Sequence, residues 1–375
     1  MDLSPTPADK PEQAIKPAPA ARRNAWLSLA ALVIILVVAG YFRTVGLMWG
    51  DYSYPHPDER FLVWVTADIA PVQHLADYFN TATSTLNPAN RGHQFYVYGD
   101  MPVILTRYLT EGLLKTAGWE QILQVGRALS AFFDLLTVLM VFLIAERLSG
   151  WKVAAVAGLL SAAAVLQIQQ AHFYTTDAVS TFFTILAIYL GVLIATEPDH
   201  TPPRRILLVD LLFGVTVGLA MASKLNTAVV AVLLPAALFV RWLRDGKSGQ
   251  ERQNLALNYI LLAVLSGALA FVTFRVAQPY AFKGPGLLDI GIDPTWLKGI
   301  RDLQAQSAGD VDFPPALQWA RRSHLFSLEN MVVWGLGIPL GVMGWAGFLL
   351  FAWRAFRRVR DWMRRTRLNS LNGKA

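Results

Sequence analysis

Eight runs of roughly 20 mostly apolar residues are the feature that most constrains this chain, because about 20 such residues are needed to cross a bilayer as a helix. Only 16% of the residues are charged and 54% are hydrophobic, whereas a soluble domain carries about 25% charged residues. The composition therefore predicts an all-α polytopic membrane protein with about eight spans. The runs lie at residues 25–45, 127–146, 153–171, 178–196, 206–223, 227–243, 256–276 and 331–353.

The distribution of basic residues predicts how the spans are oriented. If the N-terminus is cytoplasmic, the cytoplasmic segments hold 20 of the 33 Lys and Arg residues, in about half the loop length of the other side. The positive-inside rule favours this orientation, with both termini cytoplasmic. We expect the protein to lie in the plasma or inner membrane. The formal charge of +7 is then explained by the membrane, and no nucleic-acid partner is expected.

The spans divide the chain into three parts. We expect a disordered cytoplasmic tail over 1–24, a transmembrane domain over 25–353 that begins with a retained signal anchor, and a basic cytoplasmic tail over 354–375. The transmembrane domain has two long outer loops, 46–126 and 277–330. The first outer loop contains two apolar stretches, 61–70 and 101–117, which predict helices lying along the membrane surface. The second predicts a short helix near 294–306.

An acidic pair, Asp58 and Glu59, follows Pro57 at the start of the first surface helix. Proline suits the first helical position, and negative charge in the first turn is stabilised by the helix dipole. Capping of the helix alone would explain the pair. Carboxylates at the edge of an apolar membrane cavity are also suited to act as a general base or a metal ligand.

Asp177 lies at the outer junction of the third and fourth spans, at the same membrane depth as the acidic pair. It could serve only as the N-cap of the fourth helix, since Asp is a preferred capping residue. The shared depth also allows Asp58 and Asp177 to face one cleft, although 119 residues separate them.

Two cations and two histidines complete the candidate residues of the outer face. Lys224 lies in the short turn between the fifth and sixth spans, and Arg275 lies at the end of the seventh. Each can extend to the interface or bind the phosphate of a lipid. His56 and His172 are close in sequence to the acidic motifs, and each is either a metal or acceptor contact or an ordinary polar loop residue.

Several classes of protein are excluded or disfavoured. The absence of cysteine excludes disulfides, thiolate nucleophiles and cysteine metal sites. Phosphate-loop, HExxH and GxSxG motifs are also missing, which disfavours nucleotide hydrolysis and these hydrolase classes. Asp134 and Asp210 are the acids expected within spans, fewer midplane ionisable groups than an ion-driven transporter usually shows.

The ordered motifs resemble the membrane-embedded GT-C glycosyltransferases, most closely the bacterial protein O-mannosyltransferase and aminoarabinose transferase type. The resemblance rests on the order of three motifs between about residues 25 and 350: His56-Pro57-Asp58-Glu59-Arg60, Gly126-Arg127-Ala128-Leu129-Ser130 and Thr175-Thr176-Asp177. The chain departs from the family pattern because it ends after the eighth expected span, where relatives commonly continue.

The resemblance implies an inverting transfer of a sugar from a polyprenyl-phosphate donor to a protein or glycolipid acceptor at the extracytoplasmic face. It implies that Asp58 is the base, with Glu59 and Asp177 as further catalytic acids. Lys224 and Arg275 are candidates for the donor phosphate because of their charge and depth. Some relatives use a divalent metal such as Mg²⁺ or Mn²⁺, for which His56, Asp58, His172 and Asp177 are candidate ligands.

Two alternatives remain open. The chain could be a catalytically silent scaffold or partner subunit with the same fold. The third hypothesis is a transporter of a small solute or lipid, which predicts that Asp134 faces a water-filled path through the helices.

Overall fold

The computed structural model describes residues 19–318 and 320–372, and within them it contains helices and loops without a β-strand. The long helices are α1 (Pro19–Thr44), α5 (Trp119–Ser149), α8 (Thr176–Thr196), α9 (Pro203–Ser223), α11 (Gly249–Ala277) and α15 (Ile338–Asn372). A further spanning segment consists of a 3-10 helix, Leu225–Val232, that continues into α10 (Leu233–Arg244). The shorter helices include α2 (Pro57–Asp68), α4 (Asp100–Leu114), α6 (Trp151–Ala162), α7 (Val165–Ala171) and α12 (Pro294–Ala308).

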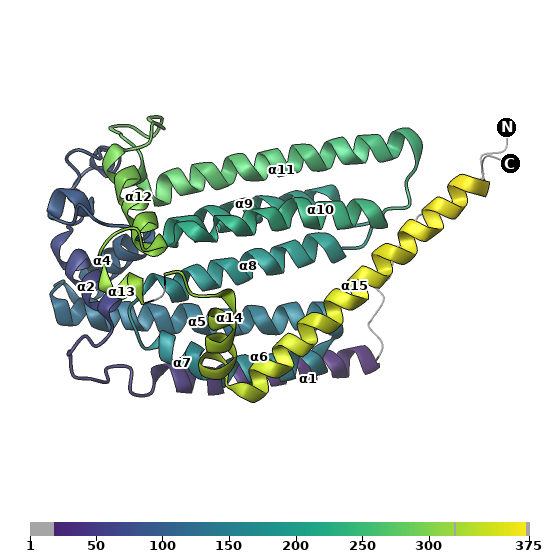
Figure 1. Cartoon of the computed structure of the whole chain (residues 1–375), viewed down its shortest axis with the longest axis horizontal. Helices are drawn as coiled ribbons and strands as arrows, with labels where there is room; N and C mark the ends of the chain where they lie inside the picture. The colour runs from purple at the N-terminus through teal and green to yellow at the C-terminus, as the bar shows by residue number, and fades with distance from the viewer. Residues whose placement is uncertain (1–18, 319, 373–375) are drawn as a thin grey trace, which may run out of the picture.

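The long helices other than α15 pack side by side into one bundle (Figure 1). Helix α1 contacts α5 and α6, α5 contacts α8, α8 contacts α9 and α10, and α9 contacts α11. Helices α2, α4 and α12 gather at one end of the bundle, which we call the loop end, and α15 crosses the view diagonally (Figure 1). The loop end therefore carries the two long segments that the sequence places outside the membrane.

The expected all-α polytopic architecture is confirmed, with local corrections. Seven described helices are long and apolar enough to span a membrane, or eight if the pair α6 and α7 is counted as one span bent by 57°. The bend lies inside the third expected span. The last spanning helix begins at Ile338 instead of 331, after a π-helical turn over Met331–Gly335.

The expected tails also differ from the structure where it describes them. Helix α1 begins at Pro19, so residues 19–24 are helical, while residues 1–18 of the expected tail lie outside the described residues. Helix α15 continues without a break from its apolar part through the basic segment to Asn372. The basic arginines after 353 thus extend the last helix.

The short helices of the loop end begin close to the positions that the sequence predicts. Helix α2 starts at Pro57, and the Nδ1 atom of His56 accepts a hydrogen bond from the amide of Asp58, 3.2 Å away. Helix α4 corresponds to the second expected surface helix, over 101–117. Asp293 caps α12 by accepting hydrogen bonds from two amides of its first turn. These caps use donors that a helix start otherwise leaves without partners.

Asp134 is buried against an arginine of the first helix. Its carboxylate forms an ion pair with Arg43, and the side chains of both residues are less than a tenth exposed. The same guanidinium donates hydrogen bonds to the carbonyl oxygens of Ala162 and Ser161. Asp134 therefore joins α1, α5 and α6. The prediction of the transporter hypothesis that this residue faces a water-filled path is wrong.

Asp100, the first residue of α4, joins the two outer loops. Its amide donates to Oε1 of Gln278 at 2.7 Å, and its Oδ2 accepts from the amide of Tyr280 at 3.3 Å. The preceding Gly99 packs so closely on the end of α9 that a Cβ atom would overlap the carbonyl oxygen of Ala222. This junction fixes the first outer loop against the second and against the end of α9.

Burial changes the acidity of Asp100. The residue is 1% exposed, and loss of solvation raises the pKa of its carboxyl to about 8, against a smaller opposing effect of the Tyr280 amide. An unfolded Asp titrates near 3.9, so between about pH 4 and pH 8 the folded state holds a proton that the unfolded state has lost. The contribution of Asp100 to stability therefore falls as the pH rises through this window and is constant above it.

Replacement of Asp100 by Asn should remove this pH dependence, because the amide keeps the acceptor for Tyr280 and cannot ionise. We expect the stability of D100N relative to the wild type to increase from pH 5 to pH 8 by up to about 1.4 kcal/mol per pH unit. Thermal unfolding of the detergent-solubilised proteins measures this difference. The exposed-acid variant D51N should keep the wild-type pH profile, and parallel profiles for D100N and the wild type would contradict the prediction.

Candidate functional site

The two adjacent acids at the start of α2 have different environments. Glu59 is fully buried and forms a bidentate ion pair with Arg127 of α5, with Nε–Oε1 and Nη2–Oε2 distances of 2.8 Å each. Oε1 also accepts a hydrogen bond from the amide of Tyr174 at 2.8 Å. The carboxylate of Glu59 is therefore occupied by structural partners.

Arg127 and its neighbour Gly126 attach α5 to three other segments. The Nη1 atom of Arg127 donates to the carbonyl oxygens of Leu47 and Trp49, both at 3.0 Å. The ring of Tyr174 lies so close to Gly126 that a Cβ atom there would overlap it. The Gly-Arg pair consequently brings the loop after α1, the start of α2 and the turn before α8 together.

Asp58 is half-buried, and its carboxylate lies near the hydroxyl of Tyr98. The pKa of Tyr98 is raised, first by burial, then by the charge and hydrogen-bonding effect of the nearby Asp58 carboxylate, and further by the charge of Asp177. Both carboxylates thus act on the same phenol. Asp58 and Asp177 therefore both lie within electrostatic range of Tyr98 at the loop end.

Asp177 forms an ion pair with Lys224. The Nζ–Oδ1 distance is 2.5 Å, and the side chains are 37% exposed for Lys224 and 41% exposed for Asp177. Asp177 is the second residue of α8, and Thr175 occupies the N-cap position, so the expectation that Asp177 is the cap itself is wrong. The ion pair leaves part of the ammonium group open to a further anion.

Arg275 has a different environment from Lys224. It is 2% exposed, and its guanidinium donates to the carbonyl oxygens of Pro279, Gly286 and Leu287. The rings of Phe79 and Phe282 lie 5.0 and 4.9 Å from it. These contacts hold the start of the second outer loop and leave Arg275 poorly placed for a donor phosphate.

The two histidines are held by backbone groups. Nδ1 of His172 lies 2.7 Å from the carbonyl oxygen of Ile168, and Nε2 lies 3.0 Å from that of Val45. His56 uses Nδ1 for the amide of Asp58, and its ring packs on Phe173. No three His, Asp or Glu residues of the described chain come together in a geometry suited to a metal ion. The candidate ligands His56, Asp58, His172 and Asp177 therefore do not form a preassembled metal cluster in this arrangement.

Reasoning from the sequence assigned no role to Arg127 or Tyr98. Arg127 lies at the outer end of the second expected span, at the depth of the acidic pair. This position could have indicated Arg127 as the ion-pair partner of Glu59. Tyr98 is one of several aromatic residues in the first outer loop, and nothing in its local sequence distinguishes it. Its contact with Asp58 depends on how the loop folds.

The chain matches a family model described as dolichyl-phosphate-mannose-protein mannosyltransferase over residues 76–280. This range is more than half of the chain and includes Tyr98, Arg127, Asp177 and Lys224. No curated protein sequence matches the chain significantly.

Two solved structures show the same fold. The oligosaccharyltransferase of Archaeoglobus fulgidus in complex with Zn and sulfate has a TM-score of 0.56 and 19% identity, and the match covers 88% of this chain and 43% of that one. The protein O-mannosyltransferase Pmt1-Pmt2 complex of S. cerevisiae bound to the sugar donor has a TM-score of 0.50 and 17% identity, with 69% and 35% of the two chains covered. The chain thus spans less than half the length of these relatives.

The family match over the central helices agrees with the resemblance that the three ordered motifs indicate, and the bundle agrees with the GT-C fold. The chain belongs to the dolichyl-phosphate-mannose-protein mannosyltransferase family, within the GT-C superfamily of membrane glycosyltransferases.

Proposed function

We propose that this protein is a membrane glycosyltransferase that transfers a sugar from a lipid-phosphate donor, with inversion, to an acceptor hydroxyl. The observation that carries the proposal is the separation of the acidic pair: Glu59 is buried in an ion pair, while Asp58 is half-buried beside Tyr98 and near the Asp177–Lys224 pair. An acid and a cation within one region are what such a transfer requires.

In the proposed reaction, Asp58 removes the proton from the acceptor hydroxyl as the oxygen attacks the anomeric carbon of the donor. The new bond forms on the face opposite the departing phosphate, which inverts the configuration. The bond between the anomeric carbon and the phosphate oxygen breaks, and its electron pair stays with the lipid phosphate. The hydroxyl of Tyr98, which lies near the carboxylate of Asp58, would help to orient it.

Lys224 is the cation that we assign to the departing phosphate. An ammonium group has three donors, and Asp177 uses one of them. Asp177 then acts as a positioning residue that holds Lys224 at the end of α9. Arg275 stabilises the second outer loop in this proposal, and Glu59 positions α2 instead of exchanging protons.

The proposed partners follow from the site. The donor is a polyprenyl-phosphate-linked sugar whose chain lies in the membrane, and the acceptor is a protein or a glycolipid. The loop end would face the extracytoplasmic side, since the segments rich in Lys and Arg lie at the other end of the long helices and favour the cytoplasm.

Replacement of Asp58 by Asn tests the assignment of the base. We expect sugar transfer to fall by at least roughly 10²-fold, the usual contribution of a general base, while expression and thermal stability stay near wild type. Transfer of radiolabelled sugar from polyprenyl-phosphate donors to peptide and glycolipid acceptors measures this. The exposed-acid variant D51N should retain activity. Full activity of D58N would refute the role, and inactivity of the wild type with every donor would favour a silent scaffold.

Replacement of Glu59 by Gln should act on stability. The substitution leaves the buried guanidinium of Arg127 without a counter-charge, and removing one partner of a buried ion pair costs about 3–5 kcal/mol. Thermal unfolding in detergent should show a large decrease for E59Q and little change for E120Q, which removes an exposed acid. Equal stabilities of the two variants would show that the ion pair does not hold α2.

Replacement of Lys224 by Gln should slow the chemical step. Loss of one group that stabilises a developing charge lowers kcat by roughly 10²-fold, and K224R should recover part of the rate because it keeps the charge. Single-turnover transfer with saturating donor separates this effect from weaker donor binding. K152Q, which removes an exposed lysine elsewhere, serves as the control, and an unchanged kcat for K224Q would exclude Lys224 from phosphate stabilisation.

A further inference from the structure

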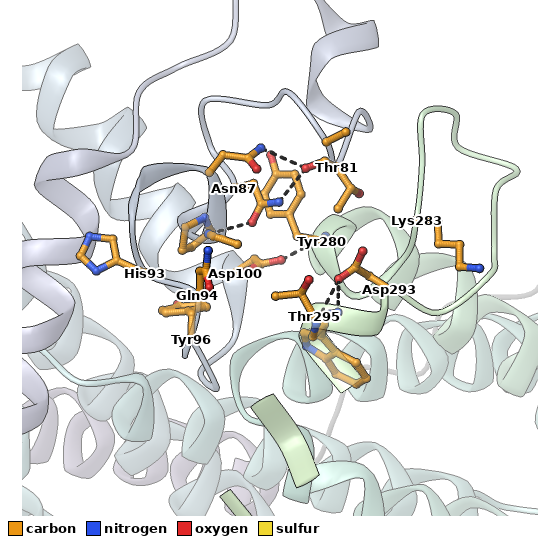
Figure 2. A pocket seen from close by; sticks show the side chains of 15 residues that line it. Thr81, Asn87, His93, Gln94, Tyr96, Asp100, Tyr280, Lys283, Asp293 and Thr295 are labelled. Atoms are coloured by element: carbon orange, nitrogen blue, oxygen red, sulfur yellow. Dashed lines mark hydrogen bonds between the residues drawn. The ribbon is translucent and has the colours of Figure 1, made fainter. Parts of the chain in front are cut away.

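A cavity of about 190 Å³ lies between the two outer loops (Figure 2). Asp58, Asp177 and Lys224 are not among the residues that line it. One side is formed by the first outer loop between Thr81 and Asp100, and the other by the second outer loop between Tyr280 and Trp296. Since pockets for drug-sized ligands occupy roughly 300–1,000 Å³, this cavity suits one small ring better than a chain of several units.

The walls of the cavity are fixed by hydrogen bonds before any ligand binds. The Nδ2 atom of Asn87 donates to the carbonyl oxygen of Thr81 at 2.7 Å, and Nδ2 of Asn90 donates to the carbonyl oxygens of Thr81 and Ser84 at 3.0 Å each. The hydroxyl of Tyr280 is 2.8 Å from Oγ of Ser84. A preformed wall reduces the ordering that binding requires.

Polar groups of both signs remain available to a ligand. Asp100 lines the cavity while only 1% exposed, and its hydrogen bond from the amide of Tyr280 uses Oδ2 and not Oδ1. Asp293 uses only Oδ1 to cap α12. Gln94 and Lys283 contribute an exposed amide and an exposed ammonium group at the same cavity.

The charges of these groups select among ligand classes. The carboxylate of Asp293 disfavours a phosphate or carboxylate ligand, and the ammonium group of Lys283 disfavours an amine. Burial raises the pKa of Asp100 to about 8, so at neutral pH it carries a proton that it can donate. A neutral ligand with several hydroxyl groups can both donate to and accept from such a set.

The aromatic side chains supply the remaining part of a ring site. Trp296, Tyr96 and Tyr280 line the same cavity, and their faces can pack on the C–H groups of a saturated ring. A pyranose has an apolar surface of C–H groups and a polar edge of hydroxyl groups. The aromatic rings of the cavity can contact the first, and its polar side chains can hydrogen-bond to the second.

We propose that this cavity, between Asp100 and Trp296, is a second binding site that holds one neutral pyranose ring and takes no part in the chemical step. The site is separated from Asp58 by the aromatic contacts among Phe61, Tyr96 and Tyr98. The ring could belong to a free sugar or to a sugar carried by an acceptor, and the two sources share the same chemistry.

Saturation-transfer NMR on the full chain in lipid nanodiscs tests the site with methyl glycosides of mannose, glucose and galactose. We expect at least one glycoside to bind the wild type, and binding to weaken about tenfold or more in D100L and in W296A. D100N should keep most of the affinity because its amide both donates and accepts. Q94A, a change of an exposed side chain, should weaken binding several-fold without loss of thermal stability, which separates binding from folding.

Further arms locate the ligand and identify its source. D58N should bind the glycosides as the wild type does. If D58N loses binding while Q94A and D100L retain it, the sugar binds at the proposed catalytic site, and the proposal is overturned. Failure of every glycoside to bind, or displacement by inorganic phosphate or a lysine-containing peptide, would also overturn it. Comparison of methyl mannoside with serine O-mannoside separates the sources: tighter binding of the serine conjugate supports an acceptor-borne sugar, and equal binding supports a free one.

Discussion

The ion pair between Glu59 and Arg127 is the interaction on which the loop end depends. Removing two charges from water costs several kcal/mol per ion, and burial is tolerated only when the remaining donors and acceptors are also satisfied. Here Glu59 accepts from Arg127 and from the amide of Tyr174, and Arg127 donates to two carbonyl oxygens after α1. The pair therefore fixes four segments at once and sets the position of Asp58 relative to α8.

Buried arginines serve the same purpose elsewhere in the bundle. Arg43, Arg127 and Arg275 are the largest fully buried side chains of the described residues, and each donates to carbonyl oxygens at the end of a helix or in a loop. A guanidinium has five donors in a fixed plane, so one side chain can satisfy several loop carbonyls. Lys224 lacks such a set of partners and stays partly exposed. Charge and membrane depth are the same for Lys224 and Arg275, so the sequence could not distinguish them, whereas their partners in the structure do.

Hydropathy predicts most of the fold because the bilayer requires helices of a fixed length. It misses the 57° bend between α6 and α7, since no proline or glycine marks residues 163–164. The local sequence also places Pro57 at the start of α2 correctly. It cannot separate Asp58 from Glu59, because adjacent residues of one helix turn share the same capping preference while their burial depends on Arg127, 68 residues away.

The carboxyl groups of the loop end show how environment divides the work of one chemical group. Glu59 has a buried counter-charge and serves a structural role. Asp177 has a partly exposed counter-charge, which leaves its partner Lys224 open to a second anion. Asp100 has no counter-charge, so burial favours its protonated form and makes it a donor as well as an acceptor. Asp58, half-buried and near the hydroxyl of Tyr98, lies between these extremes. A proton acceptor at the proposed site needs this intermediate environment, since a fully paired carboxylate cannot reach a substrate and burial without a counter-charge favours the protonated form.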